Sequence, residues 1–100
     1  MPMEYDVLAL VLGDSVQVKM LEFFLVNPDI IIQLTDIAKM IDVSHSRIHD
    51  LIGSLVKMRI LFETRSKRNR LFQLNKTHPI TKQLVELYRV TKGYKIASGY

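Results

Sequence analysis

The densest group of like charges in the sequence lies between residues 65 and 70. These six residues hold four bases, Arg65, Lys67, Arg68 and Arg70, and no acid. Guanidinium and ammonium groups bind phosphates, so this segment is suited to a polyanion, with an affinity that falls as salt rises. The alternative is a solvated loop whose charges only discourage aggregation at a strand edge. We favour phosphate binding, because the segment closely follows a second polar and basic group at positions 45–57.

Two histidines in that second group, His45 and His49, are four residues apart. On a helix this spacing places both imidazoles on one face, which can suit zinc. A metal site needs more ligands, however, and the sequence has no cysteine, one further histidine, His78, and no acidic cluster beside the pair. We therefore expect no metal and no cofactor. The sequence also lacks a glycine-rich phosphate loop and a nucleophile motif, so we do not expect an enzyme.

A helix is predicted from Ser44 to about Met58. Ser44 is a good N-cap, and the apolar residues that follow recur at the spacing of one buried helical face. That face consists of Ile48, Leu51, Ile52, Leu55 and Val56. At 100° per residue, the opposite face consists of Ser46, Asp50, Gly53 and Lys57, flanked by Arg47, Ser54 and His49. Because an α-helix fits the major groove of DNA, this polar face could read base edges.

Four side chains of the polar face are candidate base readers: Ser46, Arg47, His49 and Asp50. Arg47 could bond a guanine with two hydrogen bonds, and Asp50 could accept one from a cytosine amino group. Lys57 is better placed for a phosphate. Two alternatives stay open. Asp50 could instead pair with Arg47 three residues away, and the whole face could be a solvated helix surface.

Three elements are predicted before this helix. A helix from Asp14 to Leu25 opens on an N-cap residue and ends before Asn27-Pro28-Asp29. Ile30 to Ile32 are β-branched and follow that turn, which predicts a very short strand. Thr35 is the expected N-cap of a short helix, and Asp42-Val43-Ser44 form the turn after it. The apolar face of this short helix consists of Leu34, Ile37, Ala38 and Ile41.

Two elements are predicted after the helix at 44–58. The runs Ile60 to Arg65 and Leu71 to Leu74 indicate a hairpin, with 66–70 as its polar loop and Asn69 at the tip with a positive φ. A C-terminal helix begins with Thr77 or His78 as N-cap and Pro79 at its first position. We expect this helix to end near Lys92-Gly93, leaving a loose tail through Tyr100. Its expected buried residues are Ile80, Leu84, Leu87 and Tyr88.

This order of elements resembles the winged helix-turn-helix DNA-binding domain. The resemblance is carried by Leu34 to Gly53, with Ala38 at the small-residue position of the first helix. The apolar positions are filled by Ile37, Ile41, Val43, Ile48 and Leu51. The chain is also similar to ArsR-like and MarR-like regulators of archaea and bacteria, in Leu12 to Leu25 and in Leu55 to Leu61. It departs from their pattern at Asp42, where glycine is common.

The resemblance implies a mainly α fold with a small β-hairpin, a winged helix-turn-helix, and a sequence-specific DNA-binding transcriptional regulator. Repression is the simplest mode, with helix 44–58 in the major groove of double-stranded DNA and the wing, 65–70, on the backbone or in the minor groove. The expected DNA-binding residues are Thr35, Ser44, His45, Ser46, Arg47, His49, Asp50, Lys57, Arg65, Lys67, Arg68, Asn69 and Arg70. The rival interpretation is a protein-interaction module, or a subunit of a larger assembly that does not read DNA.

Length and composition bound these expectations. One hundred residues correspond to one domain, 1–100, and the net charge of +4 hides an uneven distribution. Residues 1–33 carry one base and five acids, a net charge of −4, whereas residues 34–100 carry 13 bases and five acids, a net charge of +8. The absence of cysteine excludes disulfides and thiol chemistry. The apolar run Val7 to Leu12 is far too short to span a bilayer, so we expect a cytoplasmic protein.

An apolar content of 48% exceeds what one small core buries. The extra apolar residues lie near the two ends of the chain: Val7, Leu8, Leu10 and Val11, and Val85, Val90 and Tyr94. In the resembling families the first and last helices commonly form a homodimer that sets two reading helices one DNA turn apart. We therefore expect a homodimer through these segments. Partly buried, frayed ends of a monomer are the alternative.

Overall fold

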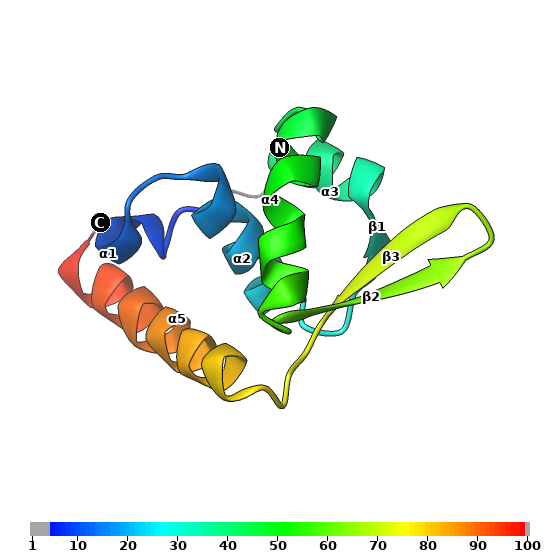
Figure 1. Ribbon diagram of the computed structural model, residues 1–100. Coiled ribbons are helices and arrows are strands. Elements are labelled where there is room, and N and C mark those ends of the chain that lie inside the picture. Colours follow the sequence, from blue (N-terminus) through cyan, green and yellow to red (C-terminus); the bar gives the residue numbers. More distant parts are fainter. Residues whose placement is uncertain (1–4, 100) are drawn as a thin grey trace.

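The computed structural model describes residues 5–99, which form five helices and a three-stranded sheet (Figure 1). The helices before the sheet are α1 (Ala9–Leu12) and α2 (Val16–Val26). The side chain of Ser15 caps α2 by accepting from the Val18 N–H at 3.2 Å, so the predicted cap at Asp14 is wrong by one residue. Gly13, with φ at 90°, ends α1, and Asp14 lies in the turn between α1 and α2, so the cap position falls on Ser15.

The next three elements are β1 (Ile31–Gln33), α3 (Leu34–Ile41) and α4 (His45–Lys57). The predicted N-cap at Thr35 is wrong, because α3 begins directly after β1 and Gln33 occupies the cap position without a side-chain hydrogen bond. The predicted turn is confirmed. Asp42 adopts the left-handed conformation at φ 57°, and Ser44 caps α4 by accepting from the Arg47 N–H at 3.4 Å. Asp42 therefore adopts the left-handed conformation that glycine commonly adopts in similar turns.

The sheet consists of β1, β2 (Leu61–Ser66) and β3 (Asn69–Leu74) in the antiparallel order β1-β3-β2. The hairpin is confirmed but its loop is shorter than predicted. Arg65 pairs with Arg70 and Ser66 with Asn69, which leaves a two-residue turn of Lys67 and Arg68. Lys67 has the positive φ, 56°, and Asn69 lies within β3. The hydrogen-bonded pairing of β2 and β3 extends through polar residues. A pattern of apolar residues could not assign these positions to strands.

The core fills the space between α2, α3, α4 and the inner face of the sheet. Its most buried large side chains include Phe23, Phe24, Ile48, Ile52 and Phe72. Of the predicted apolar face of α4, Ile48, Ile52 and Leu55 are buried, while Leu51 and Val56 pack partly against the core. This packing fixes the rotation of α4, and its polar side is left to solvent.

The last helix, α5 (Pro79–Ser98), is longer than predicted. His78 is its N-cap, with Nδ1 accepting from the Ile80 N–H at 3.1 Å, and Pro79 is its first residue. It passes through Gly93 and ends at Gly99, whose φ is 75°, so the expected loose tail is wrong for the described residues. Ile80 is exposed rather than buried, while Leu84, Leu87 and Tyr88 pack partly against the core as predicted.

The N-terminal segment is tied down by a buried acid. Glu22 on α2 is 1% exposed, and its carboxylate accepts hydrogen bonds from the N–H groups of Val7 at 3.1 Å and Leu8 at 2.6 Å. Lys95 of α5 meets Asp6 with an Nζ to Oδ1 distance of 3.2 Å. Together these contacts place residues 6–8 and the following helix α1 beside the C-terminal end of α5 (Figure 1).

Candidate nucleic-acid interface

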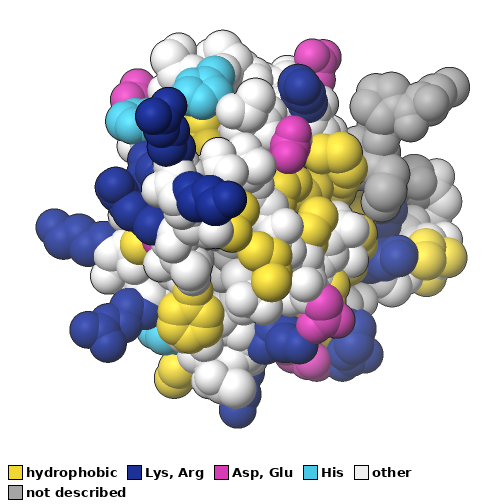
Figure 2. All heavy atoms as spheres, turned by 90° about the vertical axis from the view of Figure 1, so that its right-hand side faces the viewer, with side chains coloured by type: hydrophobic (Ala, Val, Ile, Leu, Met, Phe, Trp, Pro, Cys, Tyr) yellow, Lys and Arg dark blue, Asp and Glu magenta, His cyan; other side chains and the backbone are white. Residues whose placement is uncertain are grey.

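The polar face of α4 is open to solvent along its whole length. All seven of its predicted residues are exposed: Ser46, Arg47, His49, Asp50, Gly53, Ser54 and Lys57. The hairpin of β2 and β3 projects from the helices beside α4 (Figure 1). Figure 2 shows Lys and Arg side chains gathered on one side of the face that the hairpin points toward, with histidines among them. The structure therefore groups the helix face and the basic hairpin on one side of the molecule.

Arg47 and Asp50 do not neutralise one another. Asp50 instead approaches His49, with 3.8 Å between Oδ1 and Nδ1. Within residues 5–99, neither Arg47 nor Lys57 takes part in an ion pair. Both bases are thus available to an external anion, and the Arg47–Asp50 pairing that the sequence left open does not form.

The four bases of the hairpin divide into two pairs. Arg65 and Arg70 face each other across the ladder, and Glu63 lies beside both of them. Arg70 donates from Nε and Nη2 to Glu63 at 3.0 and 2.9 Å, while Arg65 Nε lies 3.7 Å from Glu63 Oε2. The hydrogen bonds from Arg70 lower the pKa of Glu63, and the same bonds raise the pKa of Arg70. This pair of arginines is partly neutralised inside the hairpin.

The other pair, Lys67 and Arg68, forms the turn. Both are exposed, and no ion pair involves either of them in the part of the chain that the structure describes. The free positive charge of the wing is therefore concentrated at its tip. Glu63 was not among the residues predicted from the sequence. Its position two residues before Arg65 on a strand places both side chains on one face, and this spacing could have revealed it.

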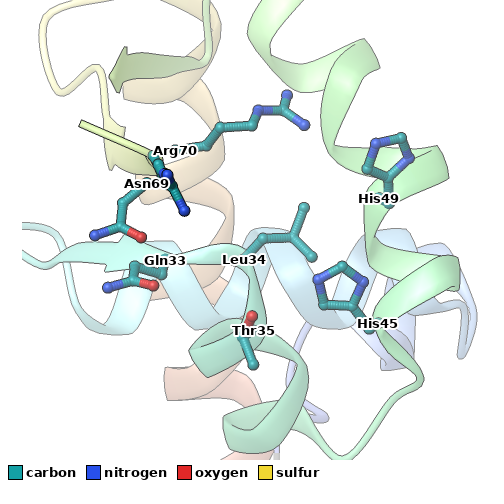
Figure 3. A pocket seen from close by; sticks show the side chains of 8 residues that line it. Gln33, Leu34, Thr35, His45, His49, Asn69 and Arg70 are labelled. Carbon is teal, nitrogen blue, oxygen red and sulfur yellow. The ribbon is translucent and has the colours of Figure 1, made fainter. Parts of the chain in front are cut away.

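A pocket of about 320 Å³ lies between α4, the hairpin and the start of α3 (Figure 3). Six of the predicted binding residues line it: Thr35, His45, His49, Arg68, Asn69 and Arg70. Gln33 and Leu34, which the sequence analysis did not select, complete the lining. Ser44, Ser46, Arg47, Asp50, Lys57, Arg65 and Lys67 lie outside it. The candidate residues thus form one pocket with exposed surfaces on either side.

Two further properties of residues 5–99 concern metals and membranes. Within this range no group of three or more His, Cys, Asp or Glu side chains is arranged to hold a metal ion. None of the described helices combines the length and the apolar character needed to cross a bilayer.

Comparison with known proteins supports the fold. No protein-family model matches the chain, and no curated protein matches it. Among solved structures, the chain is similar to the adhesin competence repressor AdcR of Streptococcus pyogenes, at 18% sequence identity and a TM-score of 0.64. The match covers 92% of this chain and 67% of that one. The chain therefore has a winged helix fold like that of AdcR, as its order of elements predicts.

Proposed function

We propose that this protein is a sequence-specific DNA-binding transcriptional regulator. The observation that carries the proposal is the shared side of α4 and the wing, where Arg47, Lys57, Lys67 and Arg68 are exposed and unpaired among the described residues. In winged helix proteins α4 would enter the major groove and the wing would contact the backbone or the minor groove. The fold similarity to a repressor is consistent with this reading.

Within this proposal the side chains have separate tasks. Ser46, Arg47 and Asp50 read base edges, and Asp50 is suited to a cytosine amino group because it is not held by Arg47. His49, the fourth candidate reader, lines the pocket beside the wing instead. Lys57 and the tip of the wing bind phosphates, which orients α4 in the groove. Ser44 keeps α4 in place through its cap. Occupying a promoter is enough to block polymerase, so repression is the proposed mode.

We also propose that two copies of the chain act as a homodimer. The support is apolar surface on α1 and α5, which lie side by side at one end of the molecule (Figure 1). The exposed apolar residues of the two helices are Leu10, Val11, Leu12, Val85, Val90, Tyr94 and Ile96. At 100° per residue, Val90 and Tyr94 share one side of α5, and Val85 and Ile96 lie on the opposite side, so a partner would cover one of the two sides. A second copy covering this surface would present two α4 helices to successive major grooves. Sedimentation of a monomer at tens of micromolar would contradict the dimer.

Selection of bound sequences from a random duplex pool tests the proposal as a whole. We expect enrichment of a defined sequence with two related half-sites, because a symmetric dimer reads a symmetric site. The control is a pool selected with the Arg47→Ala, Lys67→Ala, Arg68→Ala variant, which keeps every buried residue. If the wild-type chain shows no retention on duplex DNA even at low salt, the scaffold is a protein-interaction module and the proposal is wrong.

A further inference from the structure

The pocket between α4 and the wing has the side-chain chemistry of an anion site. His45, His49, Arg68 and Arg70 contribute groups that are positive or can become positive, and no carboxylate lines the pocket. Arg70 is already engaged by Glu63. The groups left to a ligand are therefore the guanidinium of Arg68 and the two imidazoles, together with neutral donors such as the Asn69 amide and the Thr35 hydroxyl.

The position of the pocket identifies the anion. It lies between the two elements that, under the proposed function, touch the same duplex, so a strand of the DNA backbone passes its opening. Figure 3 shows His45 and His49 on α4 on one side of the pocket, and Asn69 and Arg70 of the hairpin on the other. A volume of about 320 Å³ accommodates a phosphate group with its ester oxygens.

We propose that this pocket takes a phosphodiester of the DNA backbone and that His45 and His49 bind it in their protonated form, so that DNA affinity rises as pH falls. The inference rests on the proposed function and adds a pH dependence of DNA affinity, which the proposed function does not require. Histidine is the side chain whose charge ordinarily changes between pH 5 and 8. Protonating both imidazoles adds two positive charges beside a phosphate.

The charged neighbours of the histidines are few. On α4, Asp50 brings a negative charge beside His49, with 3.8 Å between Oδ1 and Nδ1. From the wing, Arg68 and Arg70 line the pocket with positive charge, and Glu63 offsets the charge of Arg70. From β1 and α3, the lining residues Gln33, Leu34 and Thr35 bring no titratable group. A phosphate bound in the pocket would bring negative charge beside both imidazoles and the guanidinium of Arg68.

The test measures the dissociation constant for one duplex at pH 8 and pH 6, at equal ionic strength, by fluorescence anisotropy. For the wild-type chain we expect binding about tenfold tighter at pH 6, since two exposed ion pairs are gained. The His45→Gln, His49→Gln variant should bind equally at both pH values, so that the ratio of its dissociation constants at pH 8 and pH 6 is near one, whatever its absolute affinity. The His45→Lys, His49→Lys variant keeps the charge at both pH values and should bind tightly with a ratio near one. His78→Asn is the matched control, because it removes an imidazole outside the pocket while asparagine still caps α5.

Each outcome decides the inference. A double glutamine variant with the wild-type ratio, or a wild-type chain that binds DNA equally at both pH values, overturns it while leaving the proposed function intact. Absence of DNA binding at either pH removes both proposals. Because the assay buffer contains chloride and no inorganic phosphate, a pH ratio above one has the DNA backbone as its only source of phosphate. Adding inorganic phosphate at the same ionic strength then tests competition, and a ratio that falls toward one shows that the free anion enters the same pocket.

Discussion

Arg70 and Glu63 form a two-point ion pair inside the wing. The guanidinium donates to both carboxylate oxygens, at 3.0 and 2.9 Å, and lies 5.3 Å from the centre of the Phe72 ring. Phe72 is fully buried in the core. The pair therefore links β2 to β3 within the hairpin, beside a core residue of β3, and it neutralises one of the four bases of the wing.

Replacing Glu63 with glutamine should lower the stability of the fold. The side chains of Glu63 and Arg70 are 19% and 31% exposed, so their hydrogen bonds are partly shielded from water, and we expect a loss of about 1 kcal/mol at pH 7. Because Arg70 lowers the pKa of Glu63 below its ordinary 4.5, the pair stabilises the fold above that value. This contribution is lost as pH falls through the lowered pKa.

Urea unfolding of wild type and Glu63→Gln at pH 7 and pH 3 checks this prediction. The difference in unfolding free energy should be present at pH 7 and smaller at pH 3, because pH 3 lies below the ordinary pKa of 4.5, where the carboxyl of the unfolded chain is already protonated. Glu86→Gln is the matched control, since Glu86 pairs with Arg89 on the exposed surface of α5 and its loss should have no measurable effect. Equal losses in both variants would mean that the wing pair has no special role.

The same Glu63→Gln change should strengthen DNA binding. It removes a negative charge next to Arg65 and releases Arg70, so the wing gains free positive charge. We expect a severalfold gain in affinity and a plot of log K against log salt steeper by about one unit for each phosphate newly contacted. Anisotropy titrations at three salt concentrations measure both. A weaker affinity with an unchanged slope would show that the pair instead holds the wing in its binding geometry.

The tip of the wing should dominate nonspecific affinity. Arg68→Ala removes an exposed base that no ion pair holds in the described part of the chain, and we expect weaker binding to every duplex with a slope shallower by about one unit. Lys82→Ala removes one positive charge from the exposed surface of α5 and is the control. Identical effects of the two variants would indicate that only net charge matters.

The sequence pattern was sufficient for the helix-turn-helix, because burial decides it. Ile48, Ile52 and Leu55 set the rotation of α4, and that rotation fixes which polar residues face solvent. The length of the hairpin was not predictable in the same way. Ser66 and Asn69 belong to the strands through backbone pairing. Backbone pairing does not depend on apolar side chains, so the spacing of apolar residues does not reveal it.

Contacts between residues far apart in the sequence explain the other differences between the predicted and the observed structure. Glu22 looked like one of several N-terminal acids, and only the folded chain brings the N–H groups of Val7 and Leu8 to it. Likewise, Gly93 suggested a helix end, but Lys95 contacts Asp6 and the helix continues to Ser98. Local propensity is a weak guide wherever tertiary contacts stabilise a segment.

Arg47 should control sequence preference rather than overall affinity. It is exposed in the first turn of α4 and does not pair with Asp50. Removing a bidentate contact to guanine costs about 1–3 kcal/mol on the preferred site and relaxes the choice at one base position. Selection from a random duplex pool with Arg47→Ala should therefore lose information at one position of each half-site. An unchanged sequence profile would assign Arg47 to a phosphate.

Glu22 should be essential for holding the N-terminal segment. Glu22→Leu has a similar volume but leaves the N–H groups of Val7 and Leu8 buried without acceptors, each costing about 1–3 kcal/mol. Glu22→Gln keeps one acceptor oxygen and should lose less. Urea unfolding gives the two losses, and hydrogen exchange of the Val7 and Leu8 amides reports whether the segment is released. If both variants unfold like the wild type, the buried carboxylate does not anchor the segment, and α1 needs another explanation for its place beside α5.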